Sequence, residues 1–146
     1  MRKLIVYTDG GAVGNPGPAA IGVVICNERK NVLKKYSEFL GENFTNNEAE
    51  YHALIFALKK IKQLFGKKLA KKMEIEVKSD SELMVRQLQG KYKILEEKLK
   101  NLFVEVWNLK QDFKSVKITT VKREQNQEAD ALVKEALKKR EQKTIF

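Results

Sequence analysis

The sequence of 146 residues is poor in residues that stabilise secreted proteins: it has one cysteine and two prolines. Cys26 has no partner within the chain, so we expect no internal disulfide and a reducing, cytoplasmic setting. No run of about 18 apolar residues exists, so no membrane span is expected. The opening stretch MRKLIVYTDGG has a short apolar run and no small-residue cleavage site, so we expect no signal peptide.

Positive charge is abundant and unevenly distributed. Lysine and arginine number 29 against 19 acidic residues, which gives a formal net charge of +10. The stretch from Lys59 to Lys72 alone holds seven lysines and no acid. A basic surface attracts polyanions, chiefly nucleic acid. The alternative is a solubilising surface, or that of a protein from a heat-loving host.

Hydrophobic periodicity predicts an α/β domain. Strands are expected over 3–8, 20–26, 32–40, 73–77 and 116–121, and helices over 46–65, 81–88, 94–113 and 126–140. The stretch GGAVGNPGP, residues 10–18, contains four glycines and two prolines and is therefore expected to be a turn without regular structure. This order predicts a five-stranded mixed sheet covered by helices, in one domain over 1–140 with a tail over 141–146.

The stretch TNNEAEY, residues 45–51, begins a predicted helix in an unusual way. The apolar residues that follow have helical spacing: Ala53, Leu54, Ala57, Leu58 and Ile61. Glu50 lies four residues before Leu54, so its carboxylate leans toward the face that should be buried. A buried carboxylate needs a hydrogen-bonding or ionic partner.

Four carboxylates occupy margins between core and solvent. Asp9 ends the first predicted strand, Glu50 lies one turn into the first helix, Asp80 ends the fourth strand and Asp130 lies in the last helix. Each alone has an ordinary explanation as a turn, cap, first-turn or solvated acid. Together they would repel one another unless cations were bound. Hard oxygen ligands suit magnesium or manganese, and two such ions about 4 Å apart can clamp an in-line attack of water on a phosphodiester.

Four segments carry a family resemblance. YTDGGAVGNPGPAAIGVVI, TNNEAEYHAL, VKSDSELMVRQL and REQNQEADALVKEAL resemble the ribonuclease H type 1 family, in its order and spacing, over nearly the whole chain. The resemblance implies a ribonuclease H-like fold with strand order 3-2-1-4-5 and helices on both faces of the sheet. It also implies an endonuclease, expected to be a monomer, that cleaves the RNA strand of RNA–DNA hybrids. Two Mg²⁺ or Mn²⁺ ions per site and products with 5′-phosphate and 3′-hydroxyl ends are part of the same implication.

The resemblance also suggests roles for individual residues. Four positions match the family's catalytic and metal-binding acids: Asp9, Glu50, Asp80 and Asp130. Glu48 does not match, and we interpret it as a solvated or first-turn acid.

Four further residues match substrate-binding positions of the family: Asn15, Asn46 and Asn47 at the minor groove of the hybrid, and Thr45 at a phosphate of the DNA strand. Amide side chains both donate and accept hydrogen bonds, and the wide minor groove displays the 2′-hydroxyls that distinguish RNA from DNA. These residues would equally suit turn and cap positions.

The sequence departs from the best-known members in two places. Those carry a histidine in the loop before the last helix, where this chain reads VKREQN. In that loop Glu124 is the candidate auxiliary catalytic residue and Arg123 a candidate substrate-binding residue, while His52 is interpreted as an ordinary helix residue. A basic, tryptophan-rich protrusion is also absent, since only GKYK separates the middle helices, and Trp107 is predicted to pack within its helix.

Two other functions fit the same pattern less well. A binder of hybrid or double-stranded RNA that has lost catalysis would gain nothing from four repelling carboxylates. A resolvase-like or integrase-like DNA enzyme of the same fold is disfavoured by the TNN stretch and the GNPGP turn. Whether double-stranded RNA is also cleaved stays open at this point.

Overall fold

The computed structural model describes residues 3–145 and contains one sheet with helices on both faces. Its strands are β1 (Lys3–Ala12), β2 (Gly17–Asn27), β3 (Val32–Phe44), β4 (Glu74–Ser79) and β5 (Ser115–Thr120). Its helices are α1 (Asn46–Phe65), α2 (Lys67–Ala70), α3 (Glu82–Leu88), α4 (Glu97–Lys110) and α5 (Gln127–Ile145), with a 3₁₀ turn, η1, at Arg123–Gln125. None of these helices is both long and apolar enough to cross a bilayer.

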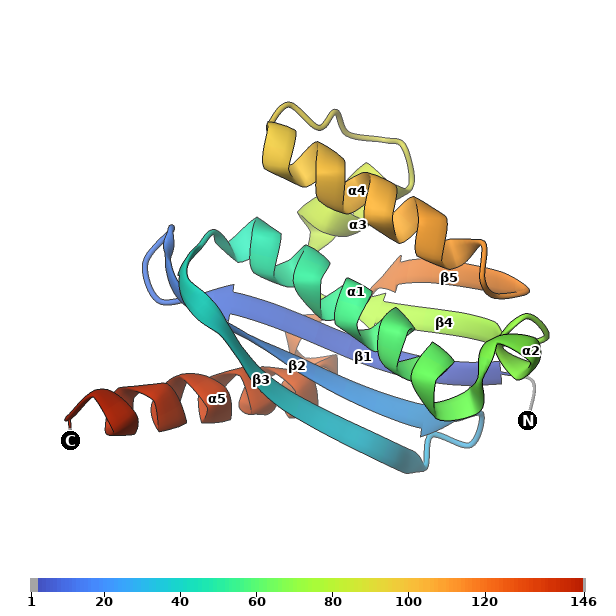
Figure 1. Cartoon of the computed structure of the whole chain (residues 1–146), viewed down its shortest axis with the longest axis horizontal. Coiled ribbons are helices and arrows are strands. Elements are labelled where there is room, and N and C mark those ends of the chain that lie inside the picture. Colours follow the sequence, from blue (N-terminus) through green and yellow to red (C-terminus); the bar gives the residue numbers. More distant parts are fainter. Residues whose placement is uncertain (1–2, 146) are drawn as a thin grey trace.

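The sheet has the order β3-β2-β1-β4-β5, which confirms the predicted order 3-2-1-4-5 (Figure 1). β1 lies at the centre, antiparallel to β2 and parallel to β4, and β4 is parallel to β5. After Lys3 the central strand continues with the run Leu4, Ile5 and Val6, all buried. A continuous apolar run of this kind suits a strand that is covered on both faces.

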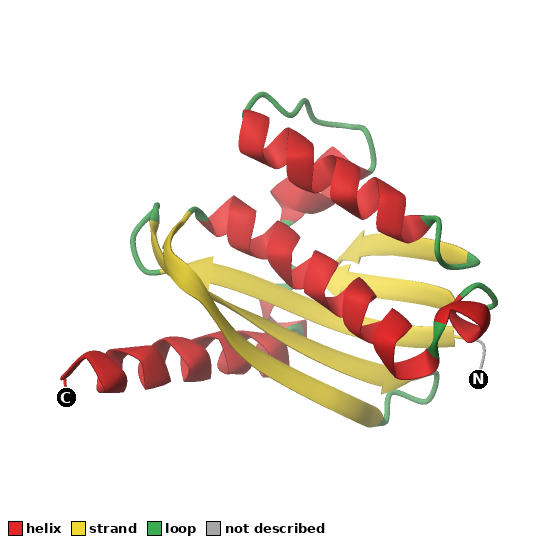
Figure 2. Cartoon of the chain, in the orientation of Figure 1, coloured by secondary structure: helices red, strands yellow, loops and turns green. Residues whose placement is uncertain are grey.

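Helices cover the two faces unequally, as Figures 1 and 2 show. α1 and α4 lie over one face, where the larger apolar core forms around Tyr51 of α1 and Leu4 and Val6 of β1. α5 lies under the other face, where Ala129 packs with Ile5. The predicted arrangement of helices on both faces is therefore confirmed.

The glycine- and proline-rich stretch is more regular than its composition predicts. β1 continues through Ala12 and β2 already begins at Gly17, so the predicted turn over 10–18 is correct only for the residues between those strands. Gly11 pairs with Ala20, and Val13 N donates to Pro18 O at 2.8 Å. Pairing with a neighbouring strand satisfies the backbone here, which overrides the local preference of glycine for turns.

The helices differ from prediction mainly at their ends. The short α2 was not expected, and α4 begins at Glu97 rather than near residue 94. α5 extends to Ile145, so most of the predicted tail over 141–146 is helical, and Phe146 lies outside the described residues. Trp107 is 56% exposed on α4, so the prediction that it is a packing residue is wrong.

Candidate active site

Asp9 and Asp80 come together because β1 and β4 are parallel neighbours. Thr8 pairs with Ser79, so the next residue of each chain segment lies at the same level of the sheet. β4 ends at Ser79 and Asp80 follows it, as predicted, whereas Asp9 lies inside β1, which continues to Ala12. Two carboxylates from separate segments thus meet at the carboxyl end of β4.

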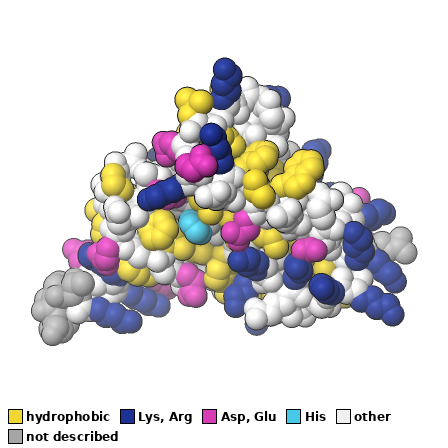
Figure 3. All heavy atoms as spheres, turned by 45° about the horizontal axis from the view of Figure 1, so that its top comes forward, with side chains coloured by type: hydrophobic (Ala, Val, Ile, Leu, Met, Phe, Trp, Pro, Cys, Tyr) yellow, Lys and Arg dark blue, Asp and Glu magenta, His cyan; other side chains and the backbone are white. Residues whose placement is uncertain are grey.

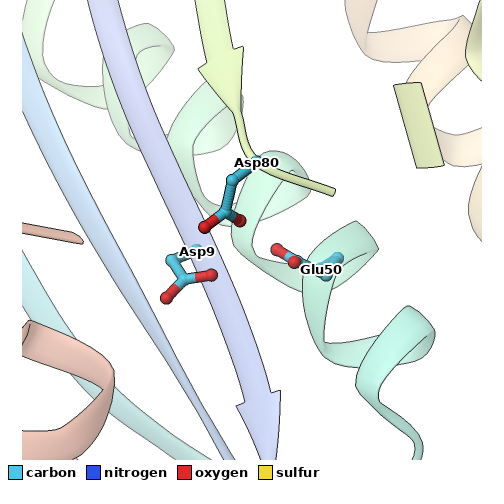
Figure 4. A group of neighbouring side chains, drawn as sticks. All are labelled: Asp9, Glu50 and Asp80. Atoms are coloured by element: carbon cyan, nitrogen blue, oxygen red, sulfur yellow. The ribbon is translucent and has the colours of Figure 1, made fainter. Parts of the chain in front are cut away.

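Glu50 reaches the same point from α1. Glu50 is 8% exposed, which confirms that its side chain faces the core, and its Oε1 accepts a hydrogen bond from Gly10 N at 2.9 Å. Carboxylate oxygens of Asp9, Glu50 and Asp80 all lie within 4.8 Å of one another, and Figure 4 shows the three side chains grouped from β1, α1 and the end of β4. We call these three residues the carboxylate cluster.

A glycine at position 10 makes this approach possible. A Cβ atom there would lie 2.3 Å from the carbonyl carbon of Ala49, a distance that real Cβ atoms essentially never show. Glycine within a strand often marks such a close approach of another backbone segment. The residue next to Asp9 therefore sets how near α1, and with it Glu50, comes to β1.

Asp130 lies beside the cluster on the first turn of α5, close to Asp9. A second glycine brings this helix near: a Cβ on Gly22, the partner of Asp9 in β2, would lie 2.1 Å from Ala129 O. Asp130 pairs with Lys134 Nζ at 2.9 Å. It lines the same cleft as the cluster, although it is not one of the three acids whose oxygens lie within 4.8 Å of one another.

Burial and mutual repulsion favour the neutral forms of these acids. Burial, and then the negative charges of Asp80 and Asp130, raise the pKa of Asp9 to about 8. Burial, and then the negative charges of Asp9 and Asp80, raise the pKa of Glu50. Burial also raises the pKa of Asp80, against the attraction of Arg123. Carboxylates this close together therefore either bind protons or are stabilised in their ionised form by a bound cation.

The chemistry of the cluster fits a hard divalent cation. Three carboxylates on two strand segments and a helix converge within reach of one ion, and oxygen is the ligand that Mg²⁺ and Mn²⁺ prefer. The surrounding cleft has a volume of about 540 Å³ and two cationic side chains, Arg123 and Lys134, line it. A cleft with acids at its floor and cations beside them can hold both a metal and an anionic substrate.

The predicted substrate-binding residues gather at the start of α1 and its neighbouring loop. Thr45 caps the helix, and Asn15 Oδ1 accepts from Asn46 N at 2.9 Å. Asn46 Oδ1 accepts from Ala12 N at 2.8 Å, and Asn46 lines the cleft. Within the described residues the Nδ2 groups of Asn15 and Asn46 have no acceptor. Each amide is therefore held in place through its oxygen, while its Nδ2 remains available to donate to a ligand.

Asn47 differs from its neighbours because it faces the protein. Its Nδ2 donates to Gln87 Oε1 at 3.4 Å, and the same oxygen accepts from the hydroxyl of Tyr51 at 2.9 Å. Its Oδ1 is buried without a hydrogen-bond partner among the described residues. An unsatisfied buried acceptor is uncommon and often marks a functional position.

Glu48 is neither solvated nor part of the cluster. It is 7% exposed, and its side chain accepts from Thr45 N at 3.0 Å while Thr45 Oγ1 accepts from Glu48 N at 3.1 Å. This capping box fixes the first turn of α1. The first-turn interpretation is confirmed and the solvated one is wrong.

The loop residues Arg123 and Glu124 separate. Arg123 lines the carboxylate cleft, but Glu124 lines a different cavity of about 300 Å³ with Tyr7 and Cys26. The structure therefore does not bring Glu124 to the carboxylates, because η1 turns neighbouring side chains to different sides. His52 is half-buried, edge-on to Phe44 at a ring-centroid distance of 5.4 Å, which fits its interpretation as an ordinary helix residue.

Sequence reasoning missed Asn126, which precedes α5. It is 1% exposed, its Nδ2 donates to Thr8 O at 2.9 Å, and hydrogen bonding by its side chain acts to lower the pKa of Asp80. It thus joins η1 to β1 immediately before Asp9. The predicted helix over 126–140 begins at this asparagine, and an asparagine at a helix start is a signal that could have found it.

Comparison with known proteins agrees with this geometry. The family model described as "Reverse transcriptase-like" matches residues 7–136. A ribonuclease H1 from compost, LC11-RNase H1, is 48% identical and superposes with a TM-score of 0.87, over 95% of this chain and 98% of that one. A second structure of LC11-RNase H1, with 50% identity, a TM-score of 0.87 and coverage of 93% and 97%, is a complex with an RNA/DNA hybrid.

The chain belongs to the ribonuclease H type 1 family. Ribonuclease HI of Halobacterium salinarum is 38% identical over 135 residues, 92% of this chain and 64% of that protein. A bifunctional protein of Mycobacterium tuberculosis is 34% identical over 136 residues, 92% of this chain and 35% of that protein. The chain therefore spans less than two thirds of the length of these two relatives.

Proposed function

We propose that this ribonuclease H domain is a metal-dependent endonuclease that hydrolyses the RNA strand of RNA–DNA hybrids at the carboxylate cluster. The observation that carries the proposal is the convergence of three carboxylates, two buried and one partly buried, with oxygens within 4.8 Å of one another in a cleft. LC11-RNase H1, a relative of half-identical sequence, binds an RNA/DNA hybrid. A binding protein without catalysis would gain nothing from acids that repel one another, so the cluster favours an enzyme.

The cofactor in this proposal is Mg²⁺ or Mn²⁺, with two ions per site. Asp9, Glu50 and Asp80 would hold them, with Asp130 as the fourth carboxylate. Bound ions of this kind activate water and stabilise charge on a phosphodiester. Hydrogen bonds hold these carboxylates in place. Glu50 accepts a hydrogen bond from Gly10 N–H, and Asp80 interacts through a hydrogen bond with the side chain of Asn126.

Recognition of the hybrid falls to the start of α1. The unpaired Nδ2 donors of Asn15 and Asn46 are suited to acceptors in the minor groove. Asn47 would reach the groove only if its side chain turned away from Gln87, because its Oδ1 is buried in this structure. Thr45, at the N-terminus of α1, is suited to a phosphate of the DNA strand. Arg123, beside the cluster, would attract the reacting phosphate.

The remaining features of the proposal follow from the family. Products would carry 5′-phosphate and 3′-hydroxyl ends, and double-stranded RNA is a candidate second substrate. We propose that the protein acts as a cytoplasmic monomer whose nuclease domain comprises residues 1–140, with 141–146 as an appendage.

One assay tests the proposal. End-labelled RNA–DNA hybrid, double-stranded RNA and double-stranded DNA are each incubated with the protein and magnesium, with EDTA as the metal-free control. We expect cleavage of the RNA strand of the hybrid only when the metal is present, and intact double-stranded DNA. Preferential cleavage of double-stranded DNA, or hybrid binding without any cleavage, would overturn the assignment in favour of a DNA nuclease or a binding protein.

A further inference from the structure

The segment between α1 and β4 carries lysines that the candidate active site does not use. Lys67 and Lys68 lie in α2, and Lys71 and Lys72 follow it directly; we call these four residues the α2 lysine cluster. Ala70 is completely buried and anchors the turn, while all four lysines are exposed. All four lysines line one groove, so their positive charges lie near one another.

Among residues 3–145, no acid forms an ion pair with the α2 lysine cluster. With Gln111 and Asp112 it lines a groove of about 520 Å³, but Asp112 is already paired with Lys62 at 2.8 Å. Lys71 Nζ donates to the backbone oxygen of Gln111 at 2.8 Å. In the part of the chain that the structure describes, the other three lysines of the cluster make no ion pair and no hydrogen bond through their side chains.

Such an arrangement is unfavourable for the isolated protein. Like charges that line one groove repel each other, whereas a surface that serves only solubility intersperses both signs. Figure 3 shows Lys and Arg side chains gathered toward the end of the molecule where α2 lies in Figure 1. Phosphates spaced along a nucleic-acid backbone would neutralise these lysines and so relieve their repulsion, and the counterions released from the nucleic acid would favour binding further.

The α2 lysine cluster lies far from the carboxylates. It ends one residue before β4, whereas Asp80 immediately follows that strand. Six residues of extended chain at about 3.3 Å each separate the two ends by roughly 20 Å. A ligand that contacts both must therefore extend well beyond the scissile phosphate.

We propose that the α2 lysine cluster is an accessory phosphate-binding surface, which holds the part of a long RNA–DNA hybrid that lies outside the active-site cleft. The inference rests on the proposed function for the identity of the duplex. Ammonium–phosphate contacts carry no sequence information, so the surface increases affinity without selecting a cleavage site. Its contribution depends on substrate length and on salt.

The test compares two hybrids and two charge-matched variants. A hybrid of about 8 base pairs is roughly 27 Å long and, centred on the cleft, ends short of the cluster, whereas one of about 24 pairs extends past it. The test variant replaces the three unpaired lysines, Lys67→Gln, Lys68→Gln and Lys72→Gln. The control variant replaces three scattered exposed lysines without ion pairs, Lys30→Gln, Lys34→Gln and Lys139→Gln.

We expect the test variant to bind the long hybrid about tenfold more weakly, with a salt dependence flatter by up to about 3 in log–log slope, at roughly 0.9 per lost phosphate contact. Its kcat/KM on the short hybrid should stay within about twofold of the wild type, and the control should affect both hybrids alike. Equal losses for test and control variants on the long hybrid would overturn the proposal. Length-dependent binding by a protein that cleaves neither hybrid would support this surface while refuting the proposed nuclease activity.

Discussion

The backbone N–H of Gly10 donates a hydrogen bond to Oε1 of Glu50 at 2.9 Å, across 40 residues of sequence. This one bond joins the central strand to the first helix beside Asp9. The hydrogen bond acts to lower the pKa of Glu50, although burial raises it more. The carboxylate cluster therefore depends on glycine at position 10, because the absence of a Cβ there sets the distance between β1, which carries Asp9, and α1, which carries Glu50.

Gly10→Ala should impair both stability and cleavage. The new methyl group would overlap the backbone of Ala49, so α1 must move and carry Glu50 with it. Overpacking of this kind costs about 1–3 kcal/mol, and the melting temperature should fall by roughly 2–4 °C per kcal/mol. Hybrid cleavage should fall at least about tenfold. Gly11→Ala is the matched control for stability, since a Cβ there would lie 3.5 Å from Val133 Cγ1, an ordinary contact. Equal effects of both substitutions would contradict this account.

Asp9→Asn and Asp80→Asn should each nearly abolish cleavage of the hybrid in magnesium. Metal-borne stabilisation of the transition state is worth several kcal/mol, so we expect a loss of at least about a thousandfold in kcat. The fold should persist, because removal of a repelling charge favours the metal-free protein. Asp112→Asn provides the same chemical change outside the cleft and should leave kcat close to that of the wild type. Near wild-type turnover by a folded Asp9→Asn protein would refute the assignment of the metal site.

The sequence allowed the cluster to be predicted but not its supports. Asp9, Glu50 and Asp80 could be identified because each acid adjoins apolar residues that are expected to be buried, and this pattern can be seen in the sequence alone. Gly10, Gly22 and Asn126 were not identified, since the need for a missing Cβ or a buried amide arises only when distant segments meet. The sequence also did not indicate that Arg123 and Glu124 line different cavities, because the 3₁₀ turn that directs their side chains apart was not predicted.

Strand ends were the least predictable part of the fold. β1 and β2 extend into the GNPGP region because each satisfies the backbone of the other there, a long-range effect that local composition opposes. α5 extends beyond Arg140 without a strong apolar stripe, and the charged sequence of residues 138–143 gave no sign of it.

The metal-free protein should lose stability as pH rises. Asp9 has a pKa of about 8 in the folded state, against roughly 3.9 in an unfolded chain. Between these values the folded state binds a proton that the unfolded state has released, so the free energy of unfolding falls as pH increases from about 4 to about 8. Each pH unit within this window costs about 1.4 kcal/mol and each kcal/mol lowers the melting temperature by roughly 2–4 °C, so in EDTA we expect it to be lower near pH 8 than near pH 5 by on the order of 10 °C.

Two further melting curves test the cause of that pH dependence. Asp9→Asn removes the titrating group, so its stability should vary less with pH than that of the wild type. Magnesium should stabilise the wild type more near pH 8 than near pH 5, because carboxylates bind metal in their ionised form. A metal-free wild type whose stability increases over this range would contradict the predicted sign.

The loop before α5 provides the last prediction, through two adjacent residues that point to different cavities. Arg123 lines the carboxylate cleft and attracts Asp80, whereas Glu124 lines the cavity beside Cys26. Arg123→Ala should raise the KM for the hybrid several-fold and flatten the log–log salt dependence by about 0.9, the value of one phosphate contact. Glu124→Ala should leave kcat and KM within about twofold of the wild type. A loss of kcat in Glu124→Ala as large as the loss of affinity in Arg123→Ala would mean that η1 rearranges when substrate binds, and that Glu124 then reaches the carboxylates.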